Sequence, residues 1–452
     1  MAGIKNTLKA VSFNHTKTRY TVCNNLANSH LPSYKQVGLT GRSYRYMQSI
    51  QENRIDNLFL GLASNKSGEL AFLLAFIAAF LEFPIQSITV FQEYYWGNVD
   101  LTRNIIKYFI KFPLFLSLSI LFFLEYKEKL ANRKYLFGFI LFTAIISTML
   151  IVILFSWKEF PDFSSGNLKS TSYHVYFYLI GYFLLTRISL LKRYRIYLFI
   201  GLAIMSLQIL LFYNISSFQI NYEGCKAKGY IHLLLGNSYA IWAILTLSQL
   251  KKYKRLILYL LLLPFLFALG SRASLYFYLL LLPVIIIETV GIKIGLVILS
   301  LGMFIFFIVS ILYKDHRMFS IFSFTDTSLL YRLKILRTNL PDIMNNFIFG
   351  DYGGFYKYEF PSNTYIHNIL SFWRQFGLIP FVLLLVLIII NGNSIFSDFK
   401  ANMTKPEFCM IGLYIFLIAS VLFAKAYNYS PLFLVLGYRD EFMYRKKQEY
   451  IS

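Results

Sequence analysis

The sequence predicts an all-α polytopic membrane protein with about twelve transmembrane helices and one long hydrophilic loop. Three observations support this class. The 452 residues are 57% hydrophobic and 15% charged, with a mean hydropathy of +0.55. Apolar runs of spanning length recur along the chain and do not alternate in polarity, as the strands of a membrane barrel do. Basic residues gather in the short segments between these runs, as is typical of cytoplasmic loops.

The predicted spans follow one another with short connections, apart from one long polar interruption after the ninth. By residue number they are 70–90, 108–125, 135–156, 173–190, 195–213, 230–250, 256–270, 271–289, 292–313, 366–390, 407–424 and 427–439. The chain therefore divides into five regions: an N-terminal segment (1–68), helices one to nine (69–313), a long loop (314–365), helices ten to twelve (366–440) and a C-terminal tail (441–452).

The N-terminal segment is polar and basic, and it lacks the apolar stretch of a cleavable signal peptide. We therefore expect the first span to serve as the insertion signal. The segment carries no motif to which a chemistry can be assigned, and a cytoplasmic, partly disordered or interfacial segment is the default expectation.

The distribution of basic residues predicts the orientation of the chain. With twelve spans, the main Lys and Arg clusters all fall on one side: 127–134, 192–195, 251–255 and 439–447. That side is the cytoplasm, so both termini are cytoplasmic and the loop 314–365 lies outside. One basic group falls on the outer side, near span two, and fits either substrate contacts or a local exception: Arg103, Lys107 and Lys111.

The net charge of +22 does not indicate a nucleic-acid partner, because much of the excess lies in short loops and no basic, aromatic-interleaved soluble domain is present. Cys23, Cys225 and Cys409 are scattered without CxxC or metal-ligand spacing, so neither a disulfide nor a zinc site is predicted. No acidic or His/Glu cluster has the spacing of a metal site. The sequence thus favours a chemistry without a metal or other cofactor.

The loop 314–365 is the most informative part of the chain. Loops of this length are usually functional or disordered. This one carries Arg317, Arg332 and Arg337, and it ends in Ser-Asn-Thr-Tyr365-Ile-His-Asn as the chain becomes apolar again. Cations, aromatic rings and a histidine together suggest chemistry on an anionic substrate at a membrane face.

Two arginines fit anion binding, and each also fits a simpler role. Arg272 lies in Leu269-Gly-Ser-Arg-Ala-Ser, at the outer turn between spans seven and eight. It suits an anion clamp, since a guanidinium matches phosphate oxygens bidentately, or an interfacial anchor. Arg332 belongs to the stretch 329–339, whose spacing predicts a short amphipathic helix near the membrane surface. There it suits either a diphosphate-bearing substrate or contact with anionic lipid.

His367 opens the tenth span, followed by Asn368. At helical spacing His367, Ser371 and Arg374 share one face. A neutral imidazole is the natural general base for a sugar hydroxyl, although His367 also fits a helix cap. We expect the neighbouring residues of the loop and of span ten to contact substrate: Arg317, Arg337, Tyr365, Asn368 and Arg374.

The turn Gly270-Ser-Arg-Ala, the arginine-bearing loop and the His-Asn entry into the helix 369–380 together resemble the bacterial O-antigen polymerase family and its relatives, the O-antigen ligases. The resemblance covers roughly residues 70–440 in architecture, but its specific motifs are short. It implies a GT-C-like glycosyltransferase in the bacterial inner membrane, with its active site facing the periplasm. By analogy, Arg272 and Arg332 hold the diphosphate leaving group and His367 deprotonates or positions the acceptor hydroxyl.

The resemblance also implies the substrate and the partners. The donor is an oligosaccharide on undecaprenyl diphosphate, and further partners are membrane lipids, a chain-length regulator and a flippase. A polymerase moves the growing glycan onto a new lipid-linked repeat unit, whereas a ligase moves it onto lipid A core, and no single residue decides between them. A flippase of lipid-linked glycans is the alternative from another class. It predicts charged residues along the spans, whereas here the ionisable groups gather at the outer end.

Overall fold

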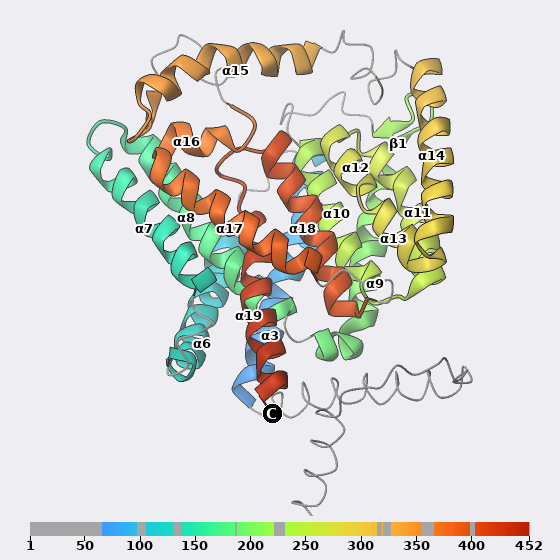
Figure 1. Ribbon diagram of the computed structural model, residues 1–452, viewed down its shortest axis with the longest axis horizontal. Coiled ribbons are helices and arrows are strands. Elements are labelled where there is room, and N and C mark those ends of the chain that lie inside the picture. Colours follow the sequence, from blue (N-terminus) through green and yellow to red (C-terminus); the bar gives the residue numbers. More distant parts are fainter. Residues whose placement is uncertain are drawn as a thin grey trace, which may run out of the picture. The chain divides into compact units, whose positions relative to one another are not determined.

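The computed structural model describes residues 66–96, 105–130, 137–185, 188–220, 231–313, 319, 327–354, 366–397 and 403–451. All of them belong to one compact unit of the chain, Phe59–Ser452. They are mostly helical (Figure 1), and several helices are long and apolar enough to cross a bilayer. The chain is therefore an all-α membrane protein, as its sequence predicts.

The first part of the described chain contains helices α3 (Lys66–Phe80), η1 (Leu81–Ile85), α4 (Gln86–Trp96), η2 (Ile105–Lys111), α6 (Phe112–Leu130), α7 (Phe137–Phe155), α8 (Pro161–Ile180), η4 (Gly181–Leu185) and α9 (Ile188–Leu211), where η marks a π-helical segment. A short antiparallel hairpin follows, in which β1 (Tyr213–Asn214) pairs with β2 (Gln219–Ile220). The remaining helices are α10 (Ile231–Leu247), α11 (Lys252–Ala268), α12 (Arg272–Leu279), α13 (Leu282–Val290), α14 (Ile292–Leu312), α15 (Thr327–Asn345), α16 (Leu370–Phe376), α17 (Leu378–Ser397), α18 (Lys405–Phe423) and α19 (Leu432–Ile451).

Seven helical stretches of the described chain have the length and hydropathy of membrane spans: Ser67–Gln92, Tyr108–Glu125, Phe137–Phe155, Arg193–Leu211, Arg272–Val290, Ile292–Leu312 and Lys405–Phe423. Helices α10 and α17 contain shorter apolar stretches. The other three predicted spans fall on α8, α11 and α19, which are not among these stretches. The total of twelve spans therefore stays a prediction.

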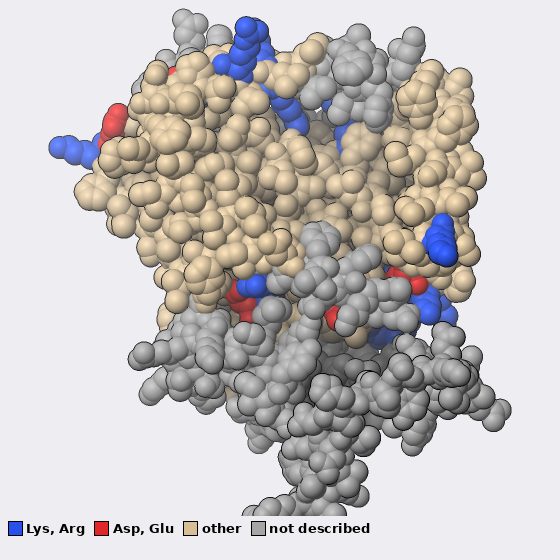
Figure 2. All heavy atoms as spheres, viewed as in Figure 1, with Lys and Arg blue, Asp and Glu red and all other residues tan. Residues whose placement is uncertain are grey.

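The apolar surface forms a band between two charged edges. In the face shown in Figure 2, the described Lys, Arg, Asp and Glu side chains lie toward the upper and lower edges, with a broad uncharged band between them. Helix α14 illustrates the band: 11% of its most apolar stretch is buried, and large apolar side chains such as Val297 and Met303 are exposed. Because apolar surface of this extent is unfavourable in water, this helix faces lipid.

The core forms where glycines let helices approach closely. A Cβ on Gly181 would meet the carbonyl oxygen of Leu434 at 1.8 Å, and a Cβ on Gly437 would meet that of Tyr178 at 2.0 Å. Helix α19 thus crosses α8 and η4 in backbone contact, which is a common use of glycine between membrane helices. Beside this crossing, α10 is buried on nearly all sides from Leu235 onward.

A π-helical segment accommodates a proline in the first span. Pro84 lies in η1, where the wider turn tolerates the missing N–H and the bulk of the ring. Glu82 of the same segment accepts a hydrogen bond from Lys111 Nζ at 2.6 Å. Lys111, one of the basic residues that the predicted orientation leaves on the outer side, thus has a partner within the protein. Arg103 lies outside the described residues.

The long loop and the tenth span differ from their predicted form. The loop contains α15, which confirms the predicted amphipathic helix and extends it to Asn345. Helix α15 runs across the upper end of the helices in Figure 1, hereafter the α15 end. The prediction of one continuous span over 366–390 was wrong: the helix begins at Leu370 and breaks at Gly377, between α16 and α17. Helix α19 also continues through most of the predicted tail 441–452.

Candidate functional site

Three basic side chains from three separate segments influence one another electrostatically at the α15 end: Arg332 of α15, His367 before α16 and Lys425 after α18. His367 keeps an exposed face, while desolvation on its protein side and the positive charges of Arg332 and Lys425 lower its pKa to about 4. Burial and Arg332 lower the pKa of Lys425 to about 8, and burial lowers the pKa of Arg332. Each therefore lies within electrostatic reach of the others, and we call them the cationic cluster.

No carboxylate of the described chain forms an ion pair with Arg332 or Lys425. The ammonium group of Lys425 instead lies 5.7 Å from the centre of the Tyr429 ring. Neighbouring cations raise each other's free energy, and they gain most from an anion with several oxygens. The arrangement is suited to binding a phosphate or diphosphate.

An apolar contact holds Arg332 and His367 near each other. Ile335, one turn after Arg332, packs with Ile343 and with Ile366, which immediately precedes His367. All three isoleucines are nearly inaccessible, at 6%, 1% and 3% exposure. The buried face of α15 thus fixes the position of the histidine.

A hydrogen-bond network positions Lys425. The segment between α18 and α19 carries this lysine and Tyr427, whose backbone N–H donates to Ser371 Oγ at 2.8 Å. The Tyr427 hydroxyl donates to Asn167 Oδ1 of α8, also at 2.8 Å. Because Ser371 follows His367 by four residues, the same network supports both basic side chains.

The network continues into α8 and into the turn after α15. Asn167 Nδ2 donates to the Tyr352 hydroxyl at 2.9 Å, which donates in turn to Ser164 Oγ at 3.3 Å. His174 Nδ1 lies 2.8 Å from Ser430 Oγ, and its ring is fully buried. His174 therefore has a structural position in the core. Buried hydrogen bonds of this kind specify one arrangement of the segments that they join.

Arg374 is buried within the protein beside this network. Its Nη2 lies 3.2 Å from Asp342 Oδ2 and 3.6 Å from Asp351 Oδ2, and the residue is 1% exposed. The sequence suggested that Arg374 shares a helical face with His367. It does not, because α16 starts only at Leu370. Its two carboxylate partners balance its charge and fasten α16 to α15 and to the turn that follows.

The other predicted substrate contacts have different surroundings. Asn368 Oδ1 accepts a hydrogen bond from Leu370 N at 3.0 Å and so helps to start α16. Arg337 is exposed on α15, five residues after Arg332 and therefore roughly 140° around the helix from it. Arg317 and Tyr365 lie outside the described residues.

Arg272 lies at the first position of α12, half-buried and within electrostatic reach of Tyr276. The preceding Ser271 is fully buried, 2.8 Å from Ser274 Oγ, and packs against Gly236 of α10. This part of the turn thus contacts protein.

Helix α12 connects Arg272 to the neighbourhood of the cationic cluster. It packs on α18, and the rings of Phe277 and Phe423 lie 6.4 Å apart. Arg272 precedes Phe277 by about one and a half turns, and Lys425 follows Phe423 by two residues. The two basic residues therefore mark the same end of two packed helices.

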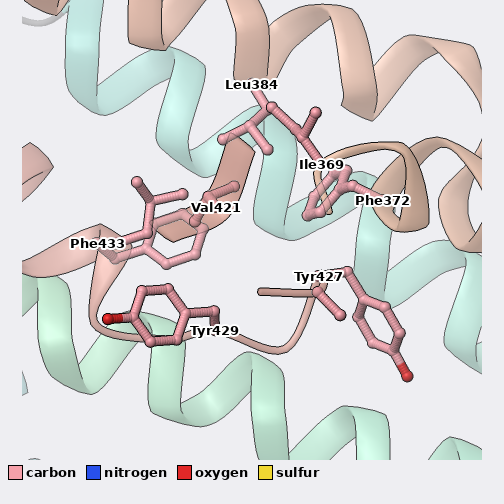
Figure 3. A pocket seen from close by; sticks show the side chains of 9 residues that line it. Ile369, Phe372, Leu384, Val421, Tyr427, Tyr429 and Phe433 are labelled. Atoms are coloured by element: carbon pink, nitrogen blue, oxygen red, sulfur yellow. The ribbon is translucent and has the colours of Figure 1, made fainter. Parts of the chain in front are cut away.

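The surface beneath Lys425 is apolar and well packed. Ile369, just before α16, and Phe372 of α16 line one small pocket with Val421 of α18, Tyr427 and Tyr429 (Figure 3). The remaining space measures about 10 Å³, which is hardly enough for one water molecule. This region supports the cationic cluster from below and has no room for a sugar.

Lys425 was not among the predicted site residues, although its position in the sequence indicates a functional role. The residue lies between the predicted spans 407–424 and 427–439, on the side to which the loop 314–365 was assigned. An ionisable residue between two apolar spans, at the end already predicted to be functional, is as strong a candidate for the site as Arg272. Among the described residues, no three His, Cys, Asp or Glu side chains lie together as metal ligands.

A comparison of the sequence with protein-family models and with curated proteins finds no match.

Proposed function

We propose that the protein is a membrane glycosyltransferase of the O-antigen polymerase type, which transfers a glycan from undecaprenyl diphosphate to a lipid-linked repeat unit. The cationic cluster is the observation that carries this proposal. It joins the two residues that the resemblance assigns to leaving-group binding and to the acceptor, Arg332 and His367, and it adds Lys425. The positive-inside rule assigns the α15 end to the periplasm.

The leaving group explains the two cations of the cluster that are charged at neutral pH, Arg332 and Lys425. When the bond from the anomeric carbon to the diphosphate breaks, negative charge grows on the diphosphate oxygens. Arg332 and Lys425 are placed to stabilise this charge, and Arg272 belongs to the same proposed site. Preorganised cations in a partly desolvated site act most strongly on charge that develops in the transition state.

His367 supplies the proton acceptor in this proposal. A pKa of about 4 keeps its imidazole neutral at neutral pH, so that a ring nitrogen can accept a hydrogen bond from the acceptor hydroxyl. The hydroxyl oxygen attacks the anomeric carbon, its proton passes to His367, and the lipid diphosphate leaves.

Donor binding itself makes His367 a better base. In the free protein, desolvation lowers its pKa most, and two nearby cations lower it further. A bound diphosphate places negative charge beside the same cations and offsets their effect, so the pKa of His367 rises toward its ordinary value. The histidine then becomes an effective base only when the leaving group is in position.

The decisive experiment compares lipopolysaccharide ladders of a host strain lacking the gene with those of strains complemented by the wild type or by His367→Ala. Under this proposal, the deletion and the alanine variant both leave a single repeat on core, and the wild type restores the ladder. Loss of every repeat from core with accumulation of lipid-linked polymer identifies a ligase instead. Repeat units that stay on the cytoplasmic side identify a flippase, and a normal ladder from the alanine variant removes His367 from the mechanism.

A further inference from the structure

A second basic site lies at the end of the helices opposite α15, in a groove of about 480 Å³. Three segments far apart in sequence supply the cations that line it: the start of α9, the turn from α10 into α11, and the start of α18. The basic side chains are Arg195, Lys251, Lys252, Lys254 and Lys405, and none of the described residues that line the groove is acidic. Basic loops are common on membrane proteins, but here distant segments converge on one cavity.

A buried arginine fixes the turn that bears three of these lysines. Arg255 donates from Nε to the carbonyl oxygen of Leu247 at 3.2 Å and from Nη2 to that of Leu250 at 2.6 Å. Its Nη1 pairs with Glu288, and its guanidinium stacks 3.6 Å from the centre of the Phe408 ring. The carbonyl group of Leu247, the last residue of α10, and that of Leu250 in the turn thus accept hydrogen bonds, and Arg255 balances the charge of Glu288 inside the protein. The turn is therefore preorganised, and Glu288, which also attracts Lys251 and Lys252, has Arg255 as its direct partner.

Apolar surface leads away from the groove along the helices that form it. Ile196 and Ile200 are 61% and 43% exposed on α9, one turn apart, beginning next to Arg195. Ile257 and Leu261 are 59% and 60% exposed on α11, just beyond the lysines. Helices α9 and α11 contact each other and both pack on α10. A ligand with a charged head and long apolar chains matches this combination, whereas a small soluble anion would leave the apolar faces unused.

We propose that the groove binds one anionic phospholipid, with the phosphate of its headgroup among the lysines and Arg195 and its acyl chains along α9 and α11. Ammonium and guanidinium groups are the usual protein partners of phosphate. Basic pockets between membrane helices bind such headgroups in other proteins. The proposal does not depend on the function proposed for the cationic cluster, since the two sites share no residue.

The test uses the purified full-length protein in a neutral detergent, with lipid binding followed by native mass spectrometry. Phosphatidylglycerol and phosphatidylcholine are each titrated against the wild type, Lys252→Gln/Lys254→Gln and Arg193→Gln/Lys293→Gln. The last variant also loses two cations at the same end, but neither residue lines the groove. Arg193 precedes Arg195 by two residues and so points roughly 200° away from it.

We expect the wild type to retain one phosphatidylglycerol in preference to phosphatidylcholine. The lysine variant should bind phosphatidylglycerol about 30-fold more weakly, because each lysine near a lipid phosphate contributes a factor of about five. The control variant should bind as the wild type does. An equal loss in both variants, or equal binding of phosphatidylcholine, overturns the proposal. Displacement of the lipid by millimolar inorganic phosphate also overturns it, since the ligand is then a soluble phosphate.

Discussion

Arg374 Nη2 lies 3.2 Å from Asp342 Oδ2, so a side chain that the sequence suggested for substrate contact ties α16 to α15. Asp351, in the turn that follows α15, pairs with the same guanidinium, with its Oδ2 3.6 Å from Arg374 Nη2. Both carboxylates come from the predicted loop 314–365. The loop is therefore fastened to the helix that follows the candidate base His367.

Replacing Arg374 should loosen this fastening. Arg374→Met leaves Asp351 buried without its cation, and breaking a buried ion pair costs about 3–5 kcal/mol. We expect a clearly lower midpoint of thermal unfolding in detergent and faster cleavage by protease within residues 327–354. Arg337→Met, at an exposed position of α15, is the matched control and should change neither. Equal effects of the two substitutions would show that the ion pairs do not hold α15.

The break between α16 and α17 requires glycine. Gly377 has φ +86°, and a Cβ there would lie 2.2 Å from the carbonyl oxygen of Ile348. We expect Gly377→Ala to destabilise the protein by more than about 2 kcal/mol, from the left-handed backbone and the clash together. Gly302→Ala is the control, because nothing lies within 4 Å of its added Cβ and alanine favours a helix. The midpoint of thermal unfolding is measured for both variants. Equal midpoints would contradict the structure at this break.

Arg332 should matter for transfer far more than its neighbour on α15. We expect Arg332→Met to lower kcat/KM for glycan transfer by about 10²–10³, the usual effect of removing one group that stabilises developing negative charge. Lys334→Met removes a cation two residues away, on an exposed position, and should leave the rate nearly unchanged. Both are measured with lipid-linked donor in proteoliposomes. Similar losses would mean that α15 provides only a general positive surface.

The pH dependence of transfer should report the cationic cluster. In the free protein, the pKa of His367 is about 4 and that of Lys425 about 8. Protonation of the base below about pH 4 and loss of the Lys425 charge above about pH 8 should each lower kcat/KM. The acidic limb of kcat should lie at higher pH than that of kcat/KM, because bound diphosphate raises the pKa of His367.

Lys425→Arg separates the two limbs of this profile. A guanidinium keeps its charge throughout this range, so the variant should lose the alkaline limb and keep the acidic one. An alkaline limb that is unchanged in Lys425→Arg would assign it to another group.

The composition and the apolar runs were sufficient to predict the fold class, and the amphipathic spacing of 329–339 was sufficient to predict a helix within the long loop. The break at Gly377 was missed because its cause lies in another segment. The helix is interrupted there, and Leu378 N donates to the carbonyl oxygen of Ile348 at 3.0 Å. A continuous apolar run gives no indication of such a long-range contact.

The site was predictable in its residue types but only partly in its arrangement. Arg332 and His367 stood out because they lie in and directly after the long polar loop, on the side away from the main basic clusters. The role of Arg374 could not be predicted, since Asp342 and Asp351 reach it only after the loop has folded back over α16. Lys425 was missed because its proximity to His367 depends on the contacts of Tyr427 with Ser371 and Asn167.

The most direct test of the proposed chemistry uses purified protein in proteoliposomes supplied with undecaprenyl-diphosphate-linked repeat units. Product length and donor binding are measured for the wild type and for His367→Ala. We expect the wild type to form longer lipid-linked glycans, and the variant to bind donor normally but to form none. Elongation by His367→Ala at the wild-type rate would contradict the assignment of this histidine, and absence of elongation by the wild type would contradict the polymerase itself.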